Sequence, residues 1–126
     1  SFAEKIESIE ADDANADWAE DFLDICRYGD ADIKTVRKVR MERLSSLEWQ
    51  LKYLSFFCRY VEKNLKNLNT SEKIIMLAGR YNCGLDKTED EVKKLIKRPS
   101  FPYGSSVKPE IQHCYTDIAL YYFLHN

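Results

Sequence analysis

Apolar residues recur at alternating steps of four and three along residues 47–68, the longest regular pattern in the chain. An α-helix completes a turn every 3.6 residues, so this spacing places one apolar side chain per turn on a single face. The stripe consists of Leu47, Leu51, Leu54, Cys58, Val61, Leu65 and Leu68. The pattern predicts a long amphipathic helix whose stripe is buried.

Shorter apolar patterns predict helices on both sides of this one. They lie near residues 2–9, 18–26, 33–44, 71–83, 89–98 and 109–122. Ser45 and Thr88 each begin a capping box, and Gly29 and Gly84 stand where a helix end favours a glycine. No strand alternation or internal repeat is visible. The expected fold is all-α, a compact multi-helix globule that forms a single domain over residues 1–126.

Charge divides the chain unevenly, although its net value is only −2. Residues 1–32 form an acidic helical segment with eleven acids and two bases, whereas residues 33–126 carry ten acids and seventeen bases. One interpretation is that the acidic segment docks on the basic remainder of the same fold. The other is that it faces a basic protein partner, since long-range fields speed such encounters.

The densest basic cluster allows the same two kinds of interpretation. Its members are Lys34, Arg37, Lys38, Arg40 and Arg43. These charges wind around the predicted helix, which favours a solvated helix near the acidic segment over a phosphate-binding surface. Neither composition nor pI indicates nucleic-acid binding.

The four cysteines, at positions 26, 58, 83 and 114, have no metal-ligand or redox spacing. We therefore expect no metal and no cofactor. Free, buried thiols and two disulfides both remain open. No apolar run is long enough to span a bilayer. The chain begins with Ser1, which suggests a processed N-terminus and is compatible with export.

The second half of the chain carries a recognisable order of motifs. A helix over Leu51–Val61 precedes Tyr81-Asn82-Cys83-Gly84, a Pro-rich loop over Pro99–Gly104 and a tyrosine-rich helix over Tyr115–Tyr122. In this order, residues 45–126 resemble the C-terminal half of lytic transglycosylases and related lysozyme-like domains. The resemblance implies action on peptidoglycan or another glycan, and it implies a secreted or periplasmic protein.

The catalytic half of that family is degenerate or missing here. Its Gly-x-x-Gln-Ile segment has a nearest match at residues 29–33, where Asp32 replaces the glutamine, and no Glu-Ser pair precedes it. If a proton donor exists, Glu20 is the candidate and Glu10 the second choice. Such an acid needs apolar walls that keep it protonated, and Trp18 and Phe22 could supply them. The alternative is that Glu20 is a solvated member of an acidic patch.

The resemblance assigns substrate binding to Tyr81 and Asn82, and to Tyr103 and Gly104 in the loop. The structural alternative is a core tyrosine, a turn asparagine and ordinary loop residues. Further tyrosines that could stack on sugars are Tyr115, Tyr121 and Tyr122, although core packing is the commoner role.

Two functions follow. The first is a lysozyme-like domain acting on peptidoglycan glycan strands. The second is a non-catalytic acidic helical binding protein, of the immunity or inhibitor type or a secreted effector, that engages a basic protein.

Overall fold

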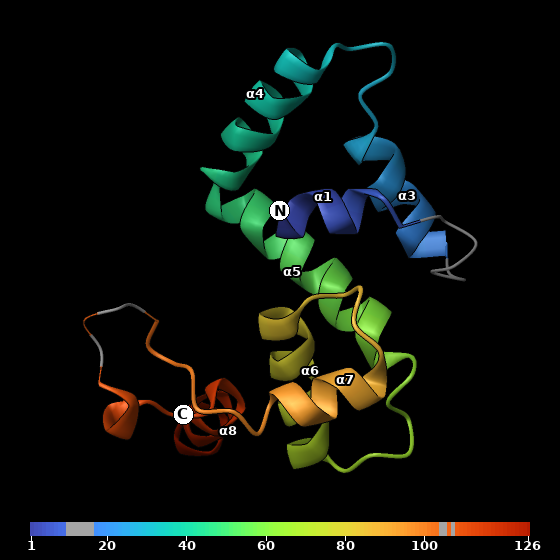
Figure 1. The fold of residues 1–126 in the computed structure, drawn as a ribbon. Helices are drawn as coiled ribbons and strands as arrows, with labels where there is room; N and C mark the ends of the chain where they lie inside the picture. The colour runs from blue at the N-terminus through green and yellow to red at the C-terminus, as the bar shows by residue number, and fades with distance from the viewer. Residues whose placement is uncertain (10–16, 104–105, 107) are drawn as a thin grey trace. The chain divides into compact units, whose positions relative to one another are not determined.

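The computed structural model describes residues 1–9, 17–103, 106 and 108–126. In these residues it contains seven α-helices, one 3-10 helix and no strand, which confirms the predicted all-α class (Figure 1). The described part of the chain has no helix long and apolar enough to cross a membrane.

The chain divides into two compact units, Ser1–Tyr60 (unit 1) and Val61–Asn126 (unit 2). The helices of unit 1 are α1 (Phe2–Glu7), α3 (Asp17–Cys26), α4 (Ile33–Leu44) and most of α5 (Leu47–Glu62). Unit 2 contains α6 (Thr70–Cys83), α7 (Glu89–Leu95), the 3-10 helix Pro109–Ile111 and α8 (Tyr115–His125).

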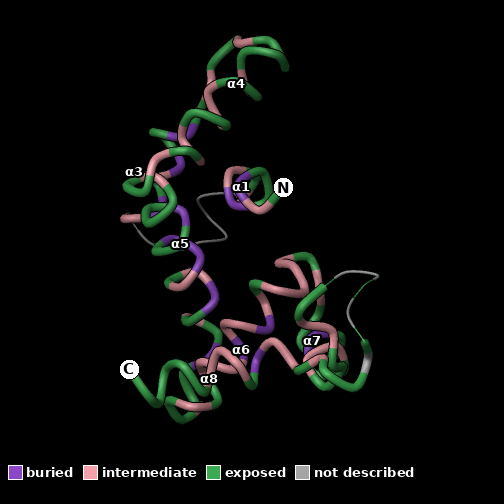
Figure 2. Tube along the Cα trace, turned by 90° about the vertical axis from the view of Figure 1, so that its left-hand side faces the viewer, coloured by how far each residue is buried: buried purple, intermediate pink, exposed green. Residues whose placement is uncertain are grey.

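The core of unit 1 forms around the aromatic face of α5. Tyr53, Phe56 and Phe57 are each at most 2% exposed. The ring of Phe2 on α1 meets Phe57 edge-on at 5.4 Å, and Phe22 on α3 lies 4.9 Å from Phe56. Burying aromatic rings removes the most apolar surface from water per residue, so this face holds α1 and α3. Figure 2 shows the alternation of buried and exposed positions along α5.

The predicted burial of the leucine stripe is wrong for the first half of α5. Leu47, Leu51 and Leu54 are 69%, 53% and 42% exposed. Helix α5 has apolar residues on more than one face, and the larger aromatic side chains occupy the face that packs. The helix also ends at Glu62, although Leu65 beyond it is buried as predicted.

The sequence signals for helix ends are confirmed at most positions. Thr88 completes a capping box and Gly84 ends α6 with a φ of 108°, both as predicted. Gly29 has a φ of 56° but lies in a turn beyond Cys26, where α3 ends, and not directly after the helix. Asn69 completes a further capping box. Ser45 differs from the prediction, since it ends α4 and its hydroxyl donates to the Met41 carbonyl at 2.9 Å. The prediction of α4 over residues 33–44 is confirmed.

Unit 2 is organised around α6, which contacts both α7 and α8. A close approach is possible at Gly79 because this residue has no side chain. A Cβ atom there would lie 2.7 Å from Ile96 Cγ2, 3.1 Å from Val92 Cγ1 and 3.7 Å from Thr116 Cγ2. Val92 and Thr116 are buried, so the contact belongs to the core of the unit.

The last helix begins later than its apolar pattern predicts. Pro109 starts a 3-10 turn, and α8 begins at Tyr115. Ile111 and Tyr122, which belong to the apolar pattern that predicts this helix, are 56% and 62% exposed. The interruption between the two helices changes the register, so one continuous helical face is not maintained.

Candidate functional site: an aromatic cluster at the end of α6

The last turn of α6 carries Tyr81 and Asn82. The helix stops at Gly84, whose N–H donates to the Arg80 carbonyl at 2.9 Å. The positive φ of Gly84 is a conformation that L side chains rarely adopt, so the glycine ends the helix directly behind these two residues.

A short antiparallel bridge holds the Pro-rich loop against the segment before α8. The Phe101 N–H donates to the His113 carbonyl at 3.0 Å, and the His113 N–H donates back at 2.7 Å. The Gln112 side chain adds a bond to the Pro102 carbonyl at 3.2 Å. These bonds fix the backbone that carries Phe101 and Tyr103.

The loop and the two helices meet in an aromatic cluster, defined here as Tyr81, Phe101, Tyr103 and Tyr115 together with Asn82. The Tyr103 hydroxyl donates to Asn82 Oδ1 at 2.7 Å. Phe101 meets Tyr103 edge-on at 6.2 Å and Tyr115 at 5.7 Å. Tyr81 stacks on Tyr115 at 6.5 Å with an interplanar angle of 21°.

The cluster has a packed inner part and an open outer part. Phe101 and Tyr115 are half-buried, and burial raises the pKa of the Tyr115 phenol, which keeps it neutral. Tyr81 is 48% and Tyr103 63% exposed. The surface therefore presents tyrosine rings beside an amide, a combination of apolar faces and neutral hydrogen-bonding groups.

Three of the four residues predicted for substrate binding lie in this cluster: Tyr81, Asn82 and Tyr103. Gly104 lies outside the described residues. Tyr121 and Tyr122, the other candidate stacking residues, contact one another at 5.8 Å on the exposed end of α8. Phe101 was not predicted, although its place two residues before Tyr103 in the Pro-rich loop was a usable signal.

The candidate acid Glu20 lies on α3 in unit 1, whereas the cluster belongs to unit 2. Its side chain is exposed, as are those of Asp21 and Asp24, and Asp24 pairs with Arg27 at 3.0 Å. Glu10 lies outside the described residues. A proton-donating role for Glu20 stays a prediction.

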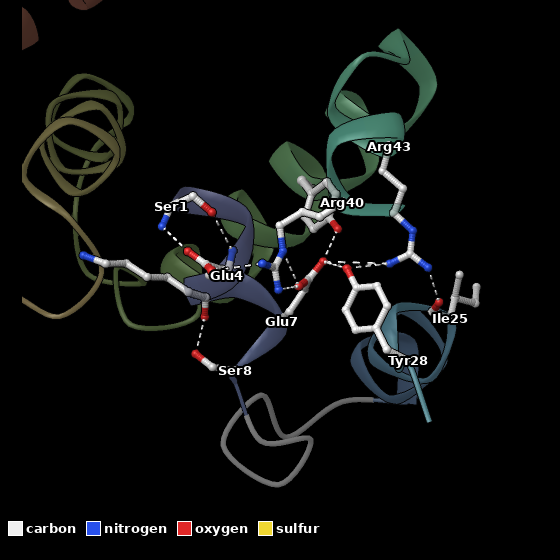
Figure 3. Close-up of polar contacts among 10 residues, drawn as sticks. Ser1, Glu4, Glu7, Ser8, Ile25, Tyr28, Arg40 and Arg43 are labelled. Atoms are coloured by element: carbon white, nitrogen blue, oxygen red, sulfur yellow. Dashed lines mark hydrogen bonds and ion pairs between the residues drawn. The ribbon is translucent and has the colours of Figure 1, made fainter. Parts of the chain in front are cut away.

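A different acid, Glu7, is the least exposed of the carboxylates that form ion pairs in the described residues. Its side chain is only 7% exposed (Figure 3). Its Oε2 accepts from Arg40 Nε at 2.9 Å and from Nη2 at 2.6 Å. Its Oε1 accepts from the Tyr28 hydroxyl at 2.6 Å and from the Tyr53 hydroxyl. The nearest contact of Arg43 with this carboxylate is 3.8 Å.

Both oxygens of Glu7 are therefore occupied as acceptors, and their partners come from the α3–α4 loop, α4 and α5. Arg43 adds contacts over the rings of Tyr28 and Trp49, at 4.9 and 4.5 Å. This arrangement joins the elements of unit 1, and we assign Glu7 a structural role. No sequence motif marked it.

The acidic start does dock on the chain's own basic residues at this point. Glu4 also pairs with Arg40, at 3.0 Å. The intramolecular interpretation is thus confirmed for Glu4 and Glu7. Of the basic cluster on α4, Lys34, Arg37 and Lys38 remain exposed.

Neither the cysteines nor the acidic residues form a further candidate site in the part of the chain that the structure describes. None of the four cysteines forms a disulfide, and burial raises the pKa of the Cys26 thiol to about 11. The described residues contain no group of three or more metal-ligating side chains. Comparison with protein-family models, curated proteins and solved structures gives no match to this chain.

Proposed function

We propose that the chain binds glycan strands of the peptidoglycan type through the aromatic cluster of unit 2. The observation that carries the proposal is the Tyr103–Asn82 hydrogen bond, which joins two positions that the resemblance to lysozyme-like domains assigns to sugar binding. Sugars present apolar C–H faces and hydroxyl groups. Exposed tyrosine rings beside an amide match both kinds of surface.

Binding without cleavage is the form of this function that the contacts favour. The acid of a glycosidase sits in an apolar pocket that keeps it protonated. Glu20 is exposed and lies among other exposed acids of α3. The proposal therefore assigns no catalytic step to the described residues.

The binding test is co-sedimentation with purified, insoluble peptidoglycan. We expect Tyr103→Ala to weaken binding about tenfold, because it removes an exposed ring and the hydrogen bond to Asn82. Tyr122→Ala is the matched control, since Tyr122 is equally exposed (62% against 63%) but lies outside the cluster. Equal loss in both variants, or retention by Tyr103→Ala, would contradict the proposal.

Cleavage is tested separately by the release of soluble fragments from the same material. We expect no release by the wild-type chain. Release that disappears in Glu20→Gln would instead establish a glycan-cleaving enzyme with Glu20 as its acid.

A further inference from the structure

A groove lies between α3 and α5, entirely within unit 1 and separate from the aromatic cluster. Its volume is about 340 Å³, and its apolar lining comes from Trp18, Phe22, Leu51 and Phe56. Trp18 and Phe22 both contact Phe56, at 5.2 and 4.9 Å, so the floor is a packed part of the core. The groove is therefore lined by side chains of two helices that pack on one another.

The exposed leucines of α5 continue this apolar surface beyond the groove. Leu47, Leu51 and Leu54 follow one another at steps of four and three, so they share one side of the helix. Isolated exposed leucines are common, but an apolar row beside a preformed groove is typical of an interaction surface. Its length of two helical turns matches a helix that inserts residues at i, i+3 or i+4, and i+7.

The charges on the rim distinguish between possible partners. Lys52 is paired with Glu48 at 2.7 Å. Arg59 lies over the Trp18 ring at 5.4 Å and has no carboxylate partner among the described residues. Arg59 is thus the charge in the groove lining that a carboxylate on the partner would complement.

From these three observations we propose that the α3–α5 groove docks an amphipathic helix of a partner protein. Apolar side chains of that helix fill the groove and cover Leu51, and an acidic residue beside them pairs with Arg59. Helix-in-groove recognition uses a preformed apolar channel of this kind and draws its specificity from the flanking charges.

The test is a selection from a displayed library of helix-forming peptides, about 16 residues long, against the full chain. Counter-selection uses Leu51→Asp, which places a charge on the groove wall at a side chain already 53% exposed, where we expect the fold to tolerate it. We expect enriched peptides to carry three apolar residues at helical spacing and an adjacent Asp or Glu.

A charge exchange then tests the pairing. Arg59→Glu is expected to weaken the best synthetic peptide about fivefold, and changing the acid of that peptide to lysine should restore its affinity for Arg59→Glu. Met41→Asp on α4, at a side chain 64% exposed, is the control and should bind as the wild type does. Circular dichroism of each variant verifies that the helices remain.

Three results would overturn the inference. One is that no peptide is enriched for binding to the wild-type chain over binding to the Leu51→Asp variant. The others are enriched peptides without an acidic residue, and a selected peptide that binds Arg59→Glu and the wild type equally. The charge exchange remains decisive if Leu51→Asp does not fold.

Discussion

At the scale of single residues, Glu4 and Glu7 show how burial changes the contribution of an ion pair to stability. Both acids lie on α1 and both pair with Arg40. The Glu4 side chain is 52% exposed, so water competes for its charge. The Glu7 side chain is 7% exposed and accepts four hydrogen bonds, so its loss would leave Arg40, Tyr28 and Tyr53 without their common acceptor.

Glu7→Gln should lower the free energy of unfolding by about 2–3 kcal/mol, because it leaves the partly buried Arg40 with only the exposed Glu4 as a countercharge. Glu4→Gln, the matched control on the same helix, should have a much smaller effect. Urea unfolding followed by circular dichroism gives both values. Equal effects of the two variants would show that Glu7 is not the centre of this network.

At the scale of elements, α1 and α3 of unit 1 pack on the aromatic face of α5. Helix α5 has a second apolar face, and this explains why the predicted burial of the leucine stripe was wrong. The spacing of the apolar residues correctly predicted a helix with leucines along one side. It could not tell which of two apolar faces would be covered, because that depends on where α1 and α3 lie. The aromatic side chains Tyr53, Phe56 and Phe57 occupy the covered face.

Phe57→Ala should destabilise the chain by about 3–5 kcal/mol, since Phe57 is 1% exposed and its removal leaves a cavity under α1. Leu54→Ala is the control on the same helix, at a side chain 42% exposed, and should cost less than about 1 kcal/mol. Thermal or urea unfolding measures both. A larger effect at Leu54 would restore the stripe as the buried face.

Local signals predicted the helices better than the contacts between them. The capping box at Thr88 and the glycine stop at Gly84 depend on neighbours in sequence, and both were read correctly. Tyr103 and Asn82 were placed in one site only through a resemblance. The Glu7 network was not predicted, because its partners lie 21 to 46 residues away and no spacing rule links them.

At the scale of the whole molecule, the net charge differs less between the two units than between residues 1–32 and residues 33–126. Residues 1–60 contain 13 acids and 9 bases, and residues 61–126 contain 8 acids and 10 bases. The net charges are therefore −4 and +2. The acidic start is partly compensated inside unit 1 by α4, which weakens the argument that it must meet a basic protein.

Ionisation of cysteine and tyrosine side chains should lower the stability of both units at alkaline pH. Burial is the main cause that raises the pKa values of Cys26, Tyr28 and Tyr53 in unit 1, and of Cys83, Cys114 and Tyr115 in unit 2. A raised pKa means that the neutral form is favoured in the folded state. This stability is present below the ordinary values of 9.0 for Cys and 10.0 for Tyr and is lost as pH rises above them.

We therefore expect the thermal midpoint to fall above about pH 9, and to fall less steeply in Tyr53→Phe, which cannot ionise at that position. Circular dichroism melts between pH 7 and 11 make the comparison. Tyr122→Phe, at an exposed tyrosine, is the control and should follow the wild-type curve. A parallel fall in Tyr53→Phe would show that this phenol does not contribute.

The two tryptophans of the chain, Trp18 and Trp49, both lie in unit 1, each with a cation over its ring. Indole fluorescence excited at its long-wavelength edge therefore reports on unit 1 alone. Trp18 lines the groove and Trp49 does not. In a Trp49→Phe variant, shielding of the remaining indole from a soluble quencher would measure occupancy of the groove directly, without a label on either molecule.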